Sequence, residues 1–183
     1  MQPSAAAVGA YAAAMGTAGL VAVLATATNR AYARQLSILL EQREFATVLD
    51  LRGERLRWLL PALAVFLVIA FVFTHELLAL FRPEFVNAGV VPLRILAAAT
   101  AFSVLFALAP TYLKYRRRNR TTYVTVACAA ATQAMLLLLL VPRFGATGAA
   151  TAYAVSMCGM YGAFAWMAHH ELALFKANRE SSA

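Results

Sequence analysis

The side chains of this chain that could bind a ligand are arginines set near or inside apolar runs. Arg94 stands about two helical turns inside the run 86–112, and a charge at that depth in a membrane usually faces protein or water. Arg30 and Arg34 are one turn apart, just after the first apolar run. A guanidinium can hold a phosphate through two parallel hydrogen bonds, so each position is a candidate anion-binding site. The alternatives are that Arg94 extends to lipid headgroups, and that Arg30 and Arg34 contact anionic lipids.

Enzyme, metal and cofactor chemistry is not expected. The chain lacks a P-loop, an HExxH motif and carboxylates paired at a useful spacing. His169, His170 and Glu171 are adjacent, and adjacent residues point apart on a helix. Cys128 and Cys158 lie in apolar runs without CxxC spacing, so we interpret them as packing residues.

The composition indicates an integral membrane protein with an all-α fold. Of the 183 residues, 62% are hydrophobic and 13% are charged, about half the charged share of a soluble domain. Five runs are long enough to span as helices, since a span needs about 20 apolar residues. These runs are 5–28, 58–80, 86–112, 121–141 and 146–170. They form one predicted membrane domain, residues 1–175, with 176–183 as a tail.

The basic residues are divided unequally between the two sides that five spans would define. Thirteen of the sixteen lie in 29–57, 113–120 and the tail, whereas Arg82, Arg94 and Arg143 belong to the other set. Cytoplasmic loops carry the excess of Lys and Arg. We therefore expect the N-terminus outside and the C-terminus in the cytoplasm. The net charge of +8 is explained by this topology, and a nucleic-acid partner is not expected.

Two connecting segments carry further structural predictions. Residues 31–57 alternate leucines with charges, which predicts an extension of the first helix and then an amphipathic piece on the cytoplasmic membrane face, with a break at Gly53. At 141–154, Pro142 and Gly145 predict a turn at the membrane surface. The small residues Gly148, Ala152 and Ser156 recur every four positions and predict close helix packing.

Four short stretches, in order, resemble a known transporter family. They are 8–14 with its Gly-x-Tyr-x-x-Ala, 80–96 with Pro-Glu-Phe and Leu-Arg-Ile-Leu, 110–120 with its basic turn, and the hinge 142–150. Together they resemble the C-terminal lobe of bacterial polysaccharide-biosynthesis flippases, relatives of multidrug extruders and lipid II flippases. Arg82 stands where that family usually has glycine, and the basic turn lacks the family's glycine.

The resemblance implies a part of a transporter rather than a whole one. The chain would supply helices eight to twelve of a two-lobed flippase that moves lipid-diphosphate-linked oligosaccharide across the bacterial plasma membrane. Arg94, Arg30 and Arg34 would then contact the diphosphate, and a separate N-lobe or a second copy would complete the cavity. The alternatives are a multidrug-type antiporter of the same superfamily and a truncated or non-transporting assembly subunit. A coupling carboxylate inside the membrane would favour the antiporter, but the spans contain only Glu76, near an edge.

Overall fold

The protein is described here by a computed structural model that covers residues 5–42, 45–116 and 118–180. Over these residues the chain is helical and contains no strand, which confirms the all-α prediction for the described part. The elements are α1 (Ala5–Glu41), α2 (Phe45–Val72), α3 (Thr74–Ala79), η1 (Pro83–Phe85), α4 (Val86–Phe106), α5 (Leu108–Tyr115) and α6 (Asn119–Glu180).

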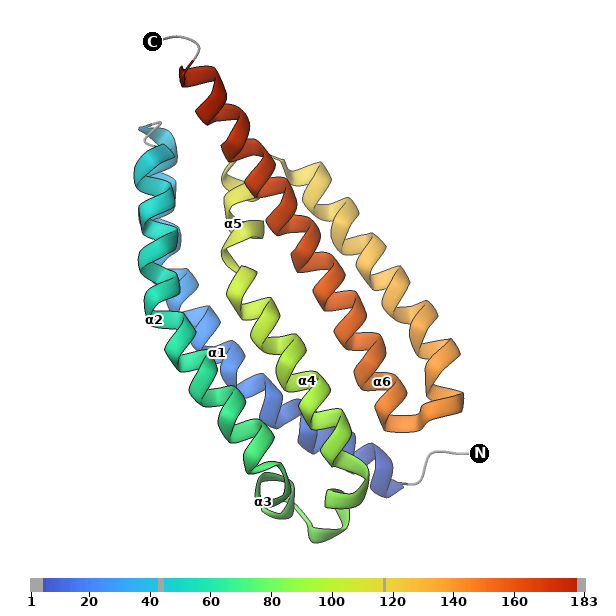
Figure 1. The fold of residues 1–183 in the computed structure, drawn as a ribbon. Coiled ribbons are helices and arrows are strands. Elements are labelled where there is room, and N and C mark those ends of the chain that lie inside the picture. The colour runs from blue at the N-terminus through green and yellow to red at the C-terminus, as the bar shows by residue number, and fades with distance from the viewer. Residues whose placement is uncertain (1–4, 43–44, 117, 181–183) are drawn as a thin grey trace.

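Helix α6 folds back on itself at Gly145, so it makes two antiparallel arms (Figure 1). We call residues 119–144 the first arm and residues 146–180 the second arm. Gly145 has φ 55° and ψ −130°, a conformation open essentially to glycine alone. Four helical segments of the described chain are long and apolar enough to cross a membrane, and the last of them, Asn119–Glu171, contains the first arm and most of the second.

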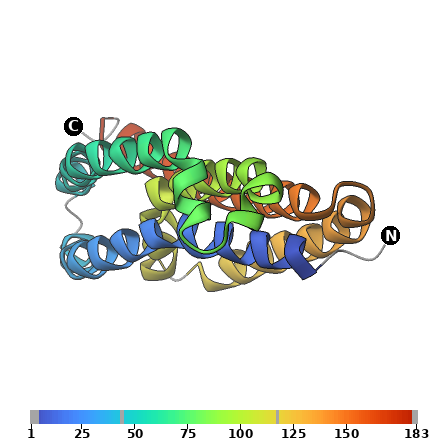
Figure 2. The ribbon, with the colours of Figure 1, turned by 90° about the horizontal axis from the view of Figure 1, so that it is seen from below.

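The helices form an elongated bundle whose connections gather at its two ends (Figure 1). The α1–α2 and α5–α6 connections lie at the end where α6 finishes, and we call this the basic end. The turn through α3 and η1 and the Gly145 turn lie at the opposite end, which we call the hinge end. Seen along the bundle, α4 lies in the middle and α1 crosses one side of it (Figure 2). Helix α4 packs against α1, α2, α3 and α6, so it is the central helix.

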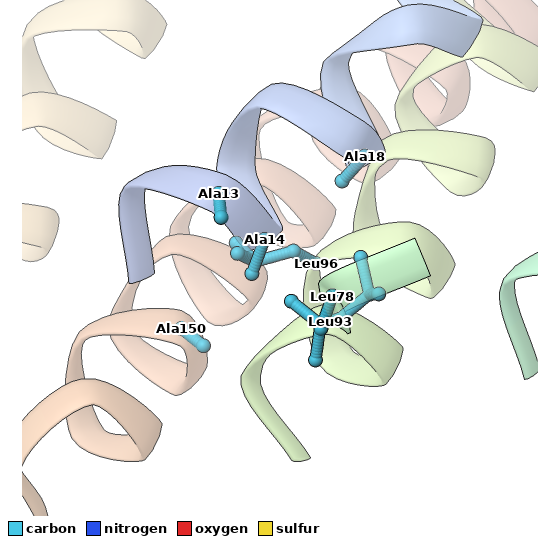
Figure 3. Packing of buried hydrophobic residues seen from close by; sticks show 7 residues of the cluster. All are labelled: Ala13, Ala14, Ala18, Leu78, Leu93, Leu96 and Ala150. Atoms are coloured by element: carbon cyan, nitrogen blue, oxygen red, sulfur yellow. The ribbon is translucent and has the colours of Figure 1, made fainter. Parts of the chain in front are cut away.

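The core at the hinge end is built from small and branched apolar side chains of four elements (Figure 3). Ala13, Ala14 and Ala18 of α1 face Leu93 and Leu96 of α4, and Leu78 and Ala150 complete the cluster. All seven are buried. Alanine on one helix lets its neighbour approach closely, which is how membrane helices gain packing energy without a hydrophobic driving force.

The outer surface is apolar, as expected of helices that face lipid. The first arm of α6 is the most exposed part of this surface, with Leu138 at 78% and Met135 at 65% exposure. Apolar patches of this extent are uncommon on soluble monomers, where they mark interaction sites. The exposed apolar side chains and the four long apolar segments therefore agree with the composition.

The segment 31–57 differs from its prediction. Helix α1 continues without interruption to Glu41, as predicted, but no separate amphipathic piece follows it. Helix α2 instead begins at Phe45 and passes straight through Gly53, so the predicted break at Gly53 is wrong. An isolated glycine is tolerated inside a helix at a cost of about 1 kcal/mol, which the packing of Val48, Leu51 and Leu59 can offset.

Two predicted spans are each interrupted once. The run 58–80 breaks at Phe73, between α2 and α3, and the run 86–112 breaks at Ala107, between α4 and α5. Pro110 explains the second break, because it has no N–H to bond the carbonyl of Phe106 four residues earlier. At the first break the Thr74 hydroxyl donates to Ala70 O at 2.6 Å and Phe71 O at 3.0 Å, a bonding pattern that bends helices.

Candidate functional site: arginines at two helix breaks

Arg94 projects from α4 onto the break between α2 and α3. Its Nη2 donates to Phe71 O at 3.1 Å and its Nε donates to Thr74 Oγ1 at 3.3 Å. Its guanidinium carbon also lies 5.9 Å from the centre of the Phe71 ring, within cation–π range. A carbonyl freed at the end of α2 thus finds a charged donor. Arg94 is half-buried, and its Nη1 makes no hydrogen bond to any described residue, so part of its charge remains available to a ligand.

Arg55 makes the equivalent contact in the opposite direction, from α2 onto the break between α4 and α5. Its Nη2 donates to Val104 O at 3.1 Å and to Asn29 Oδ1 at 3.0 Å, and its Nη1 donates to Leu105 O at 3.3 Å. Asn29 of α1 also donates to Ala107 O at 3.4 Å. Arg55 is only 2% exposed, so a full charge is buried where three helices meet.

Arg30 and Arg34 lie on the last third of α1, toward the basic end, and both are exposed. Arg94 is near the start of α4, toward the hinge end. The structure therefore brings Arg30 and Arg34 together on one helix but does not bring either of them to Arg94. A single phosphate group could contact the α1 pair or Arg94, but not both, in this conformation.

Glu171, in the second arm of α6, forms ion pairs with the α5–α6 turn. Its carboxylate lies 3.0 Å from Arg118 Nε and 3.7 Å from Arg116 Nε. The Glu171 side chain is only 15% exposed, so this pair is better shielded from water than an ordinary surface ion pair. The contact holds the basic turn against α6. Arg117, of the same turn, and Arg43 lie outside the described residues.

The residues of the α6 hinge lie at a close approach between its two arms. A side chain on Gly148 would meet the backbone of Leu140, with the Leu140 carbonyl carbon at 2.7 Å from the position of the added Cβ. Gly148, Ala152 and Ser156 are all buried. The small face therefore does two things: Gly148 admits the first arm of the same helix, and the remainder of the face lies inside the bundle.

Sequence reasoning missed Arg55 and Glu171 as structural residues. It counted Arg55 only among the basic residues of 29–57 and considered Glu171 only with its neighbours His169 and His170. For Arg55 a signal was present, because it stands in a series of four-residue steps with Leu51 before it and Leu59 and Leu63 after it, and all three leucines are buried. A charge that lies on such an apolar stripe must enter the core with it. For Glu171 the signal is the buried Phe164 and Ala168, which precede it on the same face of α6.

The groups that this arrangement offers to a ligand are cationic. Among the described residues no group of three or more His, Cys, Asp or Glu side chains could hold a metal ion. Cys128 is exposed and Cys158 is partly buried, and neither is in a disulfide. What the site can do is bind anions: at the basic end through Arg30 and Arg34, and at the hinge end through Arg94.

Comparison with known proteins adds no information about these candidate anion-binding residues. No family model matches the chain, and no curated protein and no solved structure matches it significantly. The class of protein that the fold and the site define is therefore a helical protein whose helices are long and apolar enough to span a membrane.

Proposed function

We propose that this chain is a lobe of a bacterial membrane transporter that flips lipid-diphosphate-linked oligosaccharide for polysaccharide export. The basic end would face the cytoplasm and the N-terminus would lie outside. The chain would contribute the C-terminal half of the translocation cavity, opposite an N-lobe or a second copy.

One observation carries the proposal. Three of the four stretches that resemble the flippase family meet in the core cluster at the hinge end, although they are far apart in the sequence (Figure 3). Ala13 and Ala14 come from the first stretch, Leu93 and Leu96 from the second, and Ala150 from the fourth. Gly9 belongs to the same contact, because its Cα faces the ring of Phe85. This shared position in the core is what supports a common role for the three stretches in the proposed lobe.

The placement of Arg30, Arg34 and Arg94 supports an anionic substrate. Arg30 and Arg34 would capture the diphosphate at the cytoplasmic side, and Arg94 would receive it nearer the outer side. Each group would bind more tightly in one state of the transporter, as alternating access requires. A cation antiporter would need a membrane-embedded carboxylate. In the four described candidate spans the carboxylates lie at or near the span ends, and Glu76 lies outside them in α3.

The test is deletion of the gene in the source organism, followed by measurement of both surface polysaccharide and its lipid-linked precursor. We expect surface polysaccharide to be lost and undecaprenyl-diphosphate oligosaccharide to accumulate on the cytoplasmic leaflet. Expression of the wild-type chain from a plasmid should reverse both changes. Unchanged polysaccharide with no accumulated precursor would refute the transporter assignment.

A further inference from the structure

A cavity of about 40 Å³ lies between α1, α2, the end of α4, α5 and the second arm of α6, close to the basic end. It is partly open to the surroundings, and its walls are mainly apolar. Leu36, Val48, Leu108 and Ala165 are among the residues that line it. A single water needs about 10–15 Å³ of such space, so the cavity is large enough for a small polar group.

The polar part of the cavity wall is cationic. Arg52 and Arg55, three residues apart on α2, both line it, and none of the residues that line it is Asp or Glu. The charge of Arg55 is buried, and the acceptors it bonds are the neutral oxygens of Asn29, Val104 and Leu105. A buried charge without a counter-charge is costly.

Two buried donors beside the cavity also lack acceptors. Arg55 Nε and the hydroxyl of Tyr112 have no hydrogen-bond partner among the described residues. Arg55 and Tyr112 are 2% and 4% exposed, so water outside the protein cannot satisfy them. Unsatisfied buried donors are rare in native proteins and call for a ligand or an ordered water.

We propose that this cavity binds the phosphate group of an anionic membrane lipid. Two guanidinium groups and a phenol supply the hydrogen bonds that phosphate oxygens accept. The apolar walls suit the carbon chain that adjoins a lipid phosphate, and basic pockets between membrane helices near the headgroup level are typical lipid sites. The bound lipid would neutralise Arg55 and hold α1, α2 and α5 together. This site is separate from Arg30, Arg34 and Arg94 and does not rest on the transport proposal.

The experiment measures the thermal stability of the purified chain in detergent during titration with phosphatidylglycerol, phosphatidylcholine or inorganic phosphate. We expect phosphatidylglycerol to raise the melting temperature in a saturable way and phosphatidylcholine to have no such effect. Arg52→Gln removes one cation without touching the contacts of Arg55, and should weaken binding about tenfold. Ala165→Phe fills the cavity without changing any charge and should abolish binding.

Arg57→Gln is the matched control, because Arg57 is exposed on the same helix and does not line the cavity. It should bind phosphatidylglycerol like the wild type. If inorganic phosphate at millimolar concentration gives the same stabilisation and the same dependence on Arg52, the site takes free phosphate. If Arg52→Gln and Ala165→Phe respond to phosphatidylglycerol exactly as Arg57→Gln does, the lipid acts through general surface charge and the site does not exist.

Discussion

Arg55 and Arg94 stabilise each other's helices in a reciprocal arrangement. Arg55 of α2 donates to the carbonyls of Val104 and Leu105, where α4 ends, and Arg94 of α4 donates to the carbonyl of Phe71, near the end of α2. The two helices run in opposite directions (Figure 1), so each arginine reaches the terminal part of the other's helix. At each helix break, an arginine from the neighbouring helix thus donates hydrogen bonds to backbone carbonyls.

Substitution of Arg55 by lysine should destabilise the fold. Lysine keeps the charge but cannot span Asn29, Val104 and Leu105 with one planar fork, so at least one buried acceptor loses its donor. The expected loss is about 1–3 kcal/mol of unfolding free energy, observed as a lower melting temperature in detergent. Arg57→Lys, on the exposed side of α2, should change stability by less than about 0.5 kcal/mol. Equal melting temperatures for both variants would show that the Arg55 contacts contribute nothing.

Arg94 should act on both stability and transport, and the two effects can be separated. Arg94→Lys retains the charge and should keep a partial export activity, whereas Arg94→Gln should abolish export because it loses both charge and fork geometry. Export is measured by complementation at matched folded protein levels, in the full transporter of which the chain is proposed to form part. Arg82→Gln, at an exposed position of the hinge end, is the control and should export normally. Normal export by Arg94→Gln would restrict Arg94 to its structural contact with Phe71.

Gly145 should tolerate no side chain. Its φ of 55° with ψ −130° is strained for any L-residue, so Gly145→Ala should cost about 1–3 kcal/mol and reduce folded yield. Gly159→Ala, in the second arm, is the matched control because nothing lies within 4 Å of its added Cβ. That control should be neutral or slightly stabilising, by about 0.5–1 kcal/mol, since alanine is the better helix former. A stable Gly145→Ala would mean that α6 can turn with another backbone geometry.

Gly148 should be sensitive for a different reason, which is contact rather than backbone conformation. Gly148→Ala would place a methyl group against the Leu140 carbonyl, and Gly148→Leu would force the two arms of α6 apart. We expect a graded loss of melting temperature, larger for leucine than for alanine. Gly162→Ala, which has open space around it, should leave the melting temperature unchanged or raise it. A wild-type melting temperature for Gly148→Leu would show that the arms do not touch there in the membrane.

The membrane orientation is testable by reporter fusion. A periplasmic alkaline phosphatase fused after Gly145 should be active, and the same enzyme fused after Asn119 should be inactive, because the basic end is expected to stay in the cytoplasm. Western blots at equal loading control for expression. The reverse pattern of activities would invert the proposed topology and place Arg30 and Arg34 outside.

The sequence by itself determined the helical class, the positions of the apolar runs and the segregation of charge. Each of these follows from composition and local order: long apolar runs must satisfy their backbone within helices in lipid, and basic residues gather between alternate runs. Pro142 and Gly145 also predicted the turn inside α6, because the backbone preferences of proline and glycine are local.

Only the tertiary structure decided which charged side chains are buried and where the helices bend or continue. Arg55 looks like any loop arginine until α2 packs on α4 and carries it into the core. The bend at Phe73 depends on Thr74 back-bonding and on Arg94 from another helix, and no local pattern predicted it. Gly53 stays helical because its neighbours Leu51 and Leu59 pack against other helices. Such outcomes depend on partners distant in the chain, whose contact energies outweigh local propensity by a few kcal/mol.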